Sequence, residues 1–117
     1  MQHVLKFTSD AVADIRAIPQ HLRNVLKKEM AETVAVDPVE CSKELHRELA
    51  GFRSFTWQEY RIVFRVFQDI RAIAVVGVGI RNSKSSENIY RKLEALARTG
   101  ELAQGVLFSM RGFSAKT

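Results

Sequence analysis

The alternation of apolar and polar positions predicts a strand and two helices in the first third of the chain. Residues 3–8 form a short, mostly apolar run typical of a strand, and residues 8–10 offer side-chain oxygens that can cap a following helix. Pro19 interrupts this brief helix and fits the first turn of a second one, where its missing N–H costs nothing. The second helix carries an apolar stripe at helical spacing, made of Leu22, Val25, Leu26, Met30, Thr33 and Val34. Asp37–Pro38 ends this second helix. The two consecutive helices together predict a helical hairpin.

The period changes to that of strands in the second half. Residues 52–57, 60–67 and 72–80 predict three strands, and the breaks between them are too short for parallel crossovers, so the strands are antiparallel. The last of the three is apolar at both parities, as expected of a central strand covered on both faces. Gly77 and Gly79 share a parity, which favours close packing of a neighbour over room for a substrate. The middle strand has one face with Ile62, Phe64 and Val66 and another with Arg61, Val63, Arg65 and Phe67.

A helix follows these strands, and an apolar tail follows the helix. Ser85 or Ser86 is expected to cap the helix, and Gly100 lies just past its end. Together the elements predict an α+β fold, with an N-terminal helical hairpin packed on a small, mainly antiparallel four-stranded sheet and with a C-terminal helix. We expect a domain over residues 1–100 and a C-terminal extension over residues 101–117. Five apolar residues of the extension predict that it covers the sheet or contacts a partner: Val106, Leu107, Phe108, Met110 and Phe113.

Composition narrows the classes of protein to consider. A chain of 117 residues with 46% hydrophobic residues fits one globular domain. No apolar run approaches the roughly 18 residues of a membrane-spanning helix, and the first ten residues lack the apolar stretch of a signal peptide. The single cysteine, Cys41, excludes an internal disulfide and favours a reducing compartment. We therefore expect a cytoplasmic protein that has no membrane partner.

The positive charge lies in the second half of the chain. Residues 1–50 carry seven Lys/Arg against eight Asp/Glu, whereas residues 51–117 carry eleven against five. Most of the excess is arginine, whose rigid donor fork matches phosphate geometry. This pattern fits a nucleic-acid or acidic-protein partner, and a solvated positive face remains the alternative.

Three segments resemble the RelE/ParE superfamily of toxins. They are Leu45–Gly51 (LHRELAG), Tyr60–Val66 (YRIVFRV), and Val78–Arg81 (VGIR) followed by Glu87–Leu93 (ENIYRKL). The order of elements over residues 1–98 is also similar to that superfamily. The resemblance implies a toxin of a type II toxin–antitoxin module with a cognate antitoxin. In the RelE branch it implies cleavage of mRNA on the ribosome, and in the ParE branch poisoning of DNA gyrase without catalysis; the fold alone does not choose.

RNA cleavage without a metal sets three chemical requirements. A base must take the 2′-hydroxyl proton, cations must meet the charge that builds on the phosphate, and an acid must protonate the leaving 5′ oxygen. No His, Asp and Glu cluster has metal-ligand spacing, so neither a metal nor another cofactor is expected. The resemblance implies that Arg61 and Arg81 are phosphate-binding arginines and that Tyr90 is the tyrosine of the C-terminal helix.

The chain differs from the RelE branch in the residues that would act as the general base. That branch places basic residues on the strand before the signature arginine, whereas the matching face here carries Phe52, Ser54 and Thr56, with Arg53 one step off in register. A slipped register or a loop residue would supply the missing group, and His46 is the nearby side chain of the type that titrates near neutral pH.

The sequence therefore predicts a toxin that is an mRNA interferase, an endoribonuclease that inhibits translation. The alternatives are a DNA gyrase poison or a decayed toxin that only binds its antitoxin. The expected partners are an acidic antitoxin together with mRNA and the ribosome, or with gyrase instead. The predicted catalytic residues are Arg61, Arg81, Tyr90 and His46, and the predicted RNA contacts are Arg53, Arg65, Lys84 and Arg47. Each of these residues also has a purely structural interpretation. The strand arginines can form ion pairs, the tyrosine can pack against the core, and the histidine can be solvated without a role.

Overall fold

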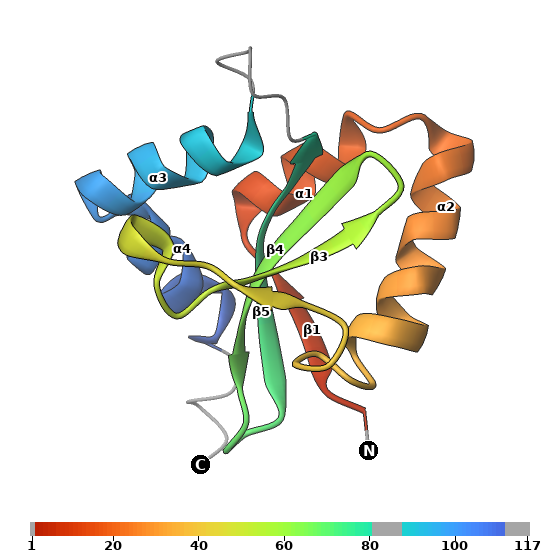
Figure 1. Ribbon diagram of the computed structural model, residues 1–117, viewed down its shortest axis with the longest axis horizontal. Coiled ribbons are helices and arrows are strands. Elements are labelled where there is room, and N and C mark those ends of the chain that lie inside the picture. The colour runs from red at the N-terminus through yellow and green to blue at the C-terminus, as the bar shows by residue number, and fades with distance from the viewer. Residues whose placement is uncertain (1, 81–87, 112–117) are drawn as a thin grey trace.

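The computed structural model describes residues 2–80 and 88–111, and it has an α+β fold (Figure 1). The first half holds β1 (Val4–Phe7), α1 (Ser9–Arg16), α2 (Gln20–Glu29), a π-helical turn η1 (Met30–Val34), β2 (Lys43–Glu44) and a 3₁₀ turn η2 (Arg47–Leu49). The second half holds β3 (Arg53–Trp57), β4 (Tyr60–Phe67), β5 (Ala72–Ile80), α3 (Ile89–Thr99) and α4 (Glu101–Ser109). The predicted helical hairpin, three-stranded meander and C-terminal helix are confirmed.

The strands form one mixed sheet in the order β1-β5-β4-β3-β2. Strand β1 pairs with β5 in parallel, and the remaining pairs are antiparallel. The sheet thus contains the four predicted strands and a fifth, β2, which the apolar pattern did not predict. Strand β2 has only two residues, both exposed, and it exists because Lys43 and Glu44 pair with Ser54 and Arg53 of β3.

Helices cover both faces of the sheet (Figure 1). Helices α1 and α2 lie over one face, where Ile62 and Phe64 of β4 are fully buried. Helices α3 and α4 lie over the other face, where Val63 is fully buried. The predicted alternation of β4 is therefore confirmed, and the doubly apolar β5 lies between the two layers.

A β-bulge shifts the register of β5 halfway along the strand. Val63 pairs with Gly77 and Phe64 with Val75, so Val76 is an extra residue without a partner on β4. As a result Val76 and Gly77, although adjacent, both face α3. A Cβ atom on Gly77 would lie 3.1 Å from Cδ1 of Ile89, so the helix packs directly on the backbone of the strand.

Short polar contacts fix where the helices begin and end. Thr8 caps α1 as predicted, with its hydroxyl accepting from the Ala11 N–H at 3.1 Å. Helix α3 is capped by Asn88, whose side-chain oxygen accepts from the Tyr90 N–H at 2.9 Å. The predicted cap at Ser85 or Ser86 was placed too early, and both serines lie outside the described residues. Gly100 ends α3 in the left-handed conformation, as predicted, with a φ of 83°.

The predicted stripe of the second helix is confirmed in part. Leu26, Met30 and Val34 are buried against the sheet, whereas Val25 is 51% exposed. Residues 26, 30 and 34 are spaced by four, so position 25 lies about 100° away around the helix and faces solvent.

The expected C-terminal extension contributes a helix to the core. Leu102 and Val106 of α4 are buried in the cluster that contains Val63, while Leu107 and Phe108 are exposed. Phe113 lies outside the described residues. Over the part of the chain that is described, no helix has the length and hydropathy needed to cross a membrane.

Candidate active site

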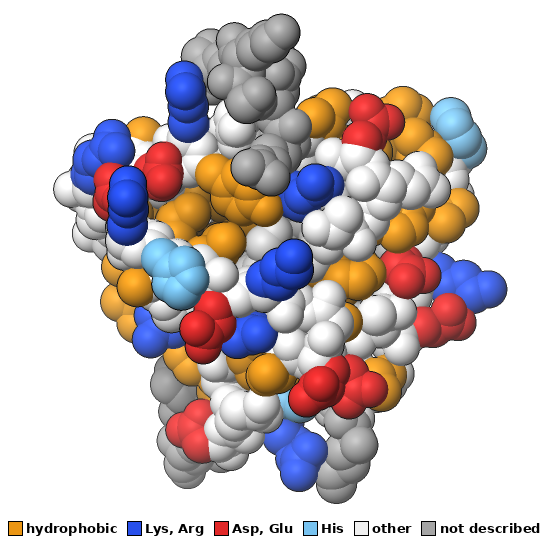
Figure 2. Space-filling view, in the orientation of Figure 1, with side chains coloured by type: hydrophobic (Ala, Val, Ile, Leu, Met, Phe, Trp, Pro, Cys, Tyr) orange, Lys and Arg blue, Asp and Glu red, His pale blue; other side chains and the backbone are white. Residues whose placement is uncertain are grey.

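A groove of about 430 Å³ opens between α3 and the sheet. Its walls come from the segment 43–49, from strands β3 and β4, and from α3. Figure 2 shows basic and acidic side chains around a patch of hydrophobic side chains on this face of the molecule. Three of the four predicted catalytic residues line the groove, although they are far apart in the sequence: His46, Arg61 and Tyr90.

Tyr90 is held by contacts on both of its sides. Its helix neighbours Ile89 and Leu93 are buried against β5, so the helix cannot rotate without breaking the core. The phenol oxygen lies 2.7 Å from the hydroxyl oxygen of Ser54, a buried residue on β3. The tyrosine therefore does more than pack, because its hydroxyl is hydrogen-bonded to that of Ser54 in the groove.

Arg61 lies on β4 beside the same floor. It pairs across the sheet with Thr56 on one side and with Gly79 on the other, and the missing side chain of Gly79 gives α3 room above the strand. One guanidinium nitrogen donates to the Tyr60 carbonyl at 3.2 Å. Within the described residues no carboxylate forms an ion pair with Arg61. This half-buried cation is consequently available for an anionic ligand.

His46 lines the groove from the segment 43–49, just before η2, and it is exposed. This segment is attached to α3 by Arg98, which donates to Glu48 at 2.8 and 3.2 Å. These hydrogen bonds from Arg98 lower the pKa of the Glu48 carboxyl. The histidine is thus carried by a short turn that is fastened to the helix of Tyr90.

Glu94 is a groove residue that the sequence reasoning missed. It follows Tyr90 by four positions, so the two side chains lie on the same face of α3, and Glu94 is half-buried in the groove wall. Helical spacing from Tyr90 was the signal that would have found it. The structure also confirms that Ser54 and Thr56 face the same side as Arg61.

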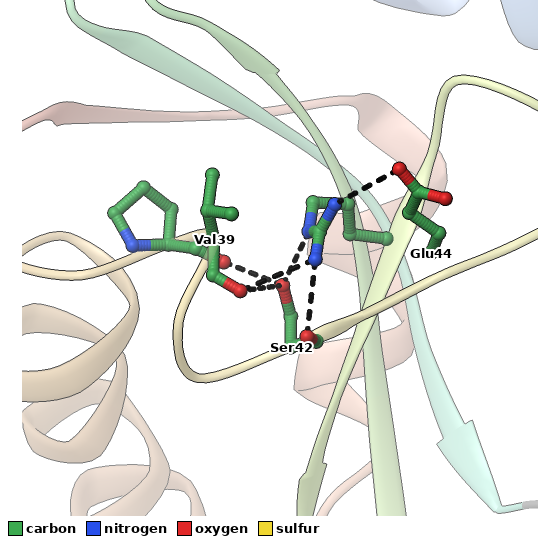
Figure 3. Close-up of polar contacts among 5 residues, drawn as sticks. Val39, Ser42 and Glu44 are labelled. Carbon is green, nitrogen blue, oxygen red and sulfur yellow. Dashed lines mark hydrogen bonds and ion pairs between the residues drawn. The ribbon is translucent and has the colours of Figure 1, made fainter.

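Arg53 binds the turn before β2 (Figure 3), and it does not line the groove. Its guanidinium donates to the Ser42 hydroxyl at 2.7 Å, to the Ser42 carbonyl at 3.1 Å and to the Val39 carbonyl at 3.2 Å. Glu44 lies 3.8 Å away as an ion-pair partner. The register of β3 is therefore not slipped, and the groove receives no base from this position.

The other predicted RNA contacts are dispersed. Arg65 is exposed over the rings of Phe52 and Phe67, at 5.8 and 5.5 Å, and lines a neighbouring hollow of about 450 Å³. Arg47 is exposed on η2 with a positive φ of 57°. Arg81 and Lys84 lie outside the described residues.

The groove offers proton donors and acceptors together with a cation. Among the described residues no group of three His, Cys, Asp or Glu side chains is placed to hold a metal ion. Cys41 is outside the groove, and burial raises the pKa of its thiol, which disfavours a nucleophilic thiolate. The arrangement is therefore suited to acid–base chemistry on a phosphate ester.

A second hollow, of about 490 Å³, lies between β1 and the helical hairpin. Its lining is mostly apolar, with Arg16, Arg23 and Lys27 among the lining residues. The Nε atom of Arg23 is buried without a hydrogen-bond partner. Strand β1 is one edge of the sheet, and its first residue, Val4, is 49% exposed. This hollow has the features of a protein-docking surface.

Comparison with known proteins gives a matching family and several similar structures. Residues 5–84 match the family described as the ParE toxin of the type II toxin–antitoxin system parDE. The chain is 26% identical to a chain of the RelBE2 toxin–antitoxin complex of Mycobacterium tuberculosis, covering 69% of this chain and 100% of that chain with a TM-score of 0.63. No curated protein matches the chain.

Two Escherichia coli structures show the same fold. A RelE toxin mutant in the free state is 22% identical over 84% of this chain and 98% of that chain, with a TM-score of 0.61. A chain of the intact RelBE toxin–antitoxin complex is 23% identical over 68% of this chain and 98% of that chain, with a TM-score of 0.56.

Proposed function

This chain belongs to the ParE toxin family of type II toxin–antitoxin systems, within the RelE/ParE superfamily, and from that premise we propose that it is a metal-independent mRNA interferase. The observation that carries the proposal is the placement of Tyr90, with its phenol oxygen 2.7 Å from the Ser54 hydroxyl, in one groove with Arg61, a cation that has no ion-pair partner among the described residues. A gyrase poison that acts only by binding has no need of an oriented phenol beside a phosphate-binding arginine.

The proposed reaction uses the 2′-hydroxyl of the substrate as the nucleophile. Arg61 binds the scissile phosphate and meets the negative charge that builds on it in the transition state. Tyr90 gives its proton to the leaving 5′ oxygen, and Ser54 keeps the phenol oriented for that transfer. The groove contains two candidates for the base, His46 and Glu94. The products are a 2′,3′-cyclic phosphate and a free 5′-hydroxyl.

The test is cleavage of mRNA in programmed ribosomes in the presence of excess EDTA. Cleavage is expected to persist, and an RNA with one 2′-deoxy sugar before the scissile phosphate is expected to resist. The Tyr90→Phe variant removes the phenol and keeps the ring, so we expect a rate loss of about 100- to 10,000-fold with RNA binding unchanged. Equal cleavage of the 2′-deoxy RNA contradicts the proposal.

Gyrase poisoning is the second candidate function, and the match of residues 5–84 to the ParE family favours it. Its test runs in parallel, as inhibition of supercoiling by purified gyrase. A protein that inhibits gyrase and leaves ribosome-bound mRNA intact is a gyrase poison. A protein that does neither and still binds an antitoxin is a decayed toxin.

Two of the similar structures are toxin–antitoxin complexes, which supports a cognate antitoxin as the partner of this chain. The hollow beside β1 suits an acidic segment with apolar side chains, because an edge strand can be extended by a partner's strand and Arg16, Arg23 and Lys27 supply positive charge. The basic second half of the chain adds attraction for the same acidic partner.

A matched pair of lysines on α2 tests this docking surface. Lys27 lines the hollow, whereas its exposed neighbour Lys28 does not. Lys27→Glu is expected to weaken co-purification with an acidic antitoxin encoded beside the toxin gene, and Lys28→Glu is expected to leave it nearly unchanged. Equal co-purification of the two variants contradicts docking at this hollow.

A further inference from the structure

We propose that Glu94 is the general base of the groove, an inference that rests on the RNA-cleavage function proposed above. The geometry singles it out in three ways. Glu94 lines the groove as a half-buried residue, it lies on the same helix face as Tyr90, and within the described residues it forms no ion pair.

The absence of an ion pair matters because cations are near. Arg98 is four positions further along α3, at the spacing that favours pairing with Glu94, but its guanidinium binds Glu48 on η2. Lys92 on the same helix binds Asp14 of α1 at 2.6 Å. Two cations of the helix are therefore committed elsewhere, and the Glu94 carboxylate keeps its lone pairs for a ligand in the groove.

The spacing of Glu94 and Tyr90 suits an acid and a base that serve one phosphate. Residues four apart on a helix have Cβ atoms about 5–6 Å apart. Each group must come within about 2.6–3.2 Å of the oxygen with which it exchanges a proton, one on each side of the phosphorus. His46 fits this arrangement less well, since it is exposed and lies on the segment 43–49, whereas Tyr90 and Glu94 share one face of α3.

The step balances without a co-reactant. Glu94 accepts the proton of the 2′-hydroxyl as the 2′ oxygen forms its bond to phosphorus, and the bond from phosphorus to the 5′ oxygen breaks. Tyr90 donates its proton to the 5′ oxygen, while Arg61 binds the phosphate oxygens. Solvent then takes one proton from Glu94 and returns one to Tyr90, so the enzyme is restored.

The experiment separates base from acid by changing the leaving group. Ribosome-bound RNA is prepared with the natural linkage and with sulfur in place of the bridging 5′ oxygen, because a thiolate leaves without being protonated. Glu94→Gln is expected to lose about 100-fold or more in rate on both substrates. Tyr90→Phe is expected to lose on the natural substrate and to recover on the sulfur substrate. Glu101→Gln, an exposed carboxyl on α4, is the matched control and is expected to cleave like the wild type.

Each outcome decides the proposal. Normal cleavage by Glu94→Gln, or recovery of that variant on the sulfur substrate, overturns the role of Glu94 while the proposed function stands. Failure of the wild-type protein to cleave, or cleavage of 2′-deoxy RNA, removes the proposed function and this inference with it. Equal circular dichroism spectra and equal melting temperatures for Glu94→Gln and wild type show that a rate loss is not a folding defect.

Discussion

Replacing Gly77 by alanine is expected to destabilise the fold through the contact between β5 and α3. The new Cβ atom would lie 3.1 Å from Cδ1 of Ile89 and 3.2 Å from both Cδ atoms of Leu93, whereas ordinary contacts begin at 3.4 Å. The neighbours must therefore move by about 0.3 Å, the difference between 3.4 and 3.1 Å. Ile89 is 2% exposed and Leu93 is fully buried, so neither side chain can swing into solvent. Overpacking of this kind costs about 1–3 kcal/mol.

The same substitution tests how the groove is built. Tyr90 lies between Ile89 and Leu93 on α3, so a displaced helix carries the phenol away from Ser54, which is 2.7 Å from it. Gly105→Ala is the matched control. Its Cβ atom would meet Thr8 at an ordinary 3.5 Å, and Gly105 is inside helix α4, so alanine is expected to stabilise the protein by about 0.5–1 kcal/mol.

Urea denaturation followed by circular dichroism measures both variants. The expected order of stability is Gly105→Ala above wild type and wild type above Gly77→Ala, and RNA cleavage is expected to fall only in the Gly77 variant. We infer that the missing side chain of Gly77 on β5 sets the position of α3. This inference is refuted if the Gly77→Ala protein is as stable and as active as the wild type.

Three other substitutions test individual contacts. Asp14→Ala leaves the Val78 N–H without its acceptor at 3.0 Å, and we expect a loss of about 1–3 kcal/mol in urea denaturation. Asn88→Ala removes the N-cap of α3 and is expected to cost about 1 kcal/mol, measured as a lower melting temperature. Arg98→Gln removes the guanidinium cation, whose hydrogen bonds lower the pKa of the Glu48 carboxyl. The stability difference from wild type is expected to be present above the unfolded-state pKa of that carboxyl and to vanish as the pH falls through its lowered folded-state pKa. A difference that persists at acid pH would show that the pair acts through packing.

The strands could be predicted because their boundaries are local. Polar breaks at 58–59 and 68–71 end apolar runs, and the bounds of β4 and β5 agree with those predicted. Strand β2 could not be predicted in this way, since its two exposed residues have no apolar pattern and become a strand only by pairing with β3. The cap of α3 was misplaced because Ser85, Ser86 and Asn88 are all good capping residues, and local sequence does not rank them.

The part of the groove that strands form could be predicted, because alternation along a strand decides which side chains face it. Parity placed Ser54 and Thr56 beside Arg61 and put Arg53 on the other face, and the structure agrees. Glu94 was missed for a different reason. A helix shows its periodicity in the sequence, but which polar residue beside the stripe faces the sheet depends on the direction in which α3 crosses it.

The bulge in β5 shows where sequence parity fails. A bulge inserts one residue and moves every later side chain to the other face, so it is visible in a sequence only when the strand alternates between apolar and polar residues. Strand β5 is apolar at both parities, and a shift at Val76 leaves the pattern unchanged. Strict alternation would turn Gly77 and Gly79 towards α1 and α2, as it does Val75. The extra residue turns both glycines towards α3 instead, where their missing side chains let the helix descend onto the sheet and bring Tyr90 to Ser54.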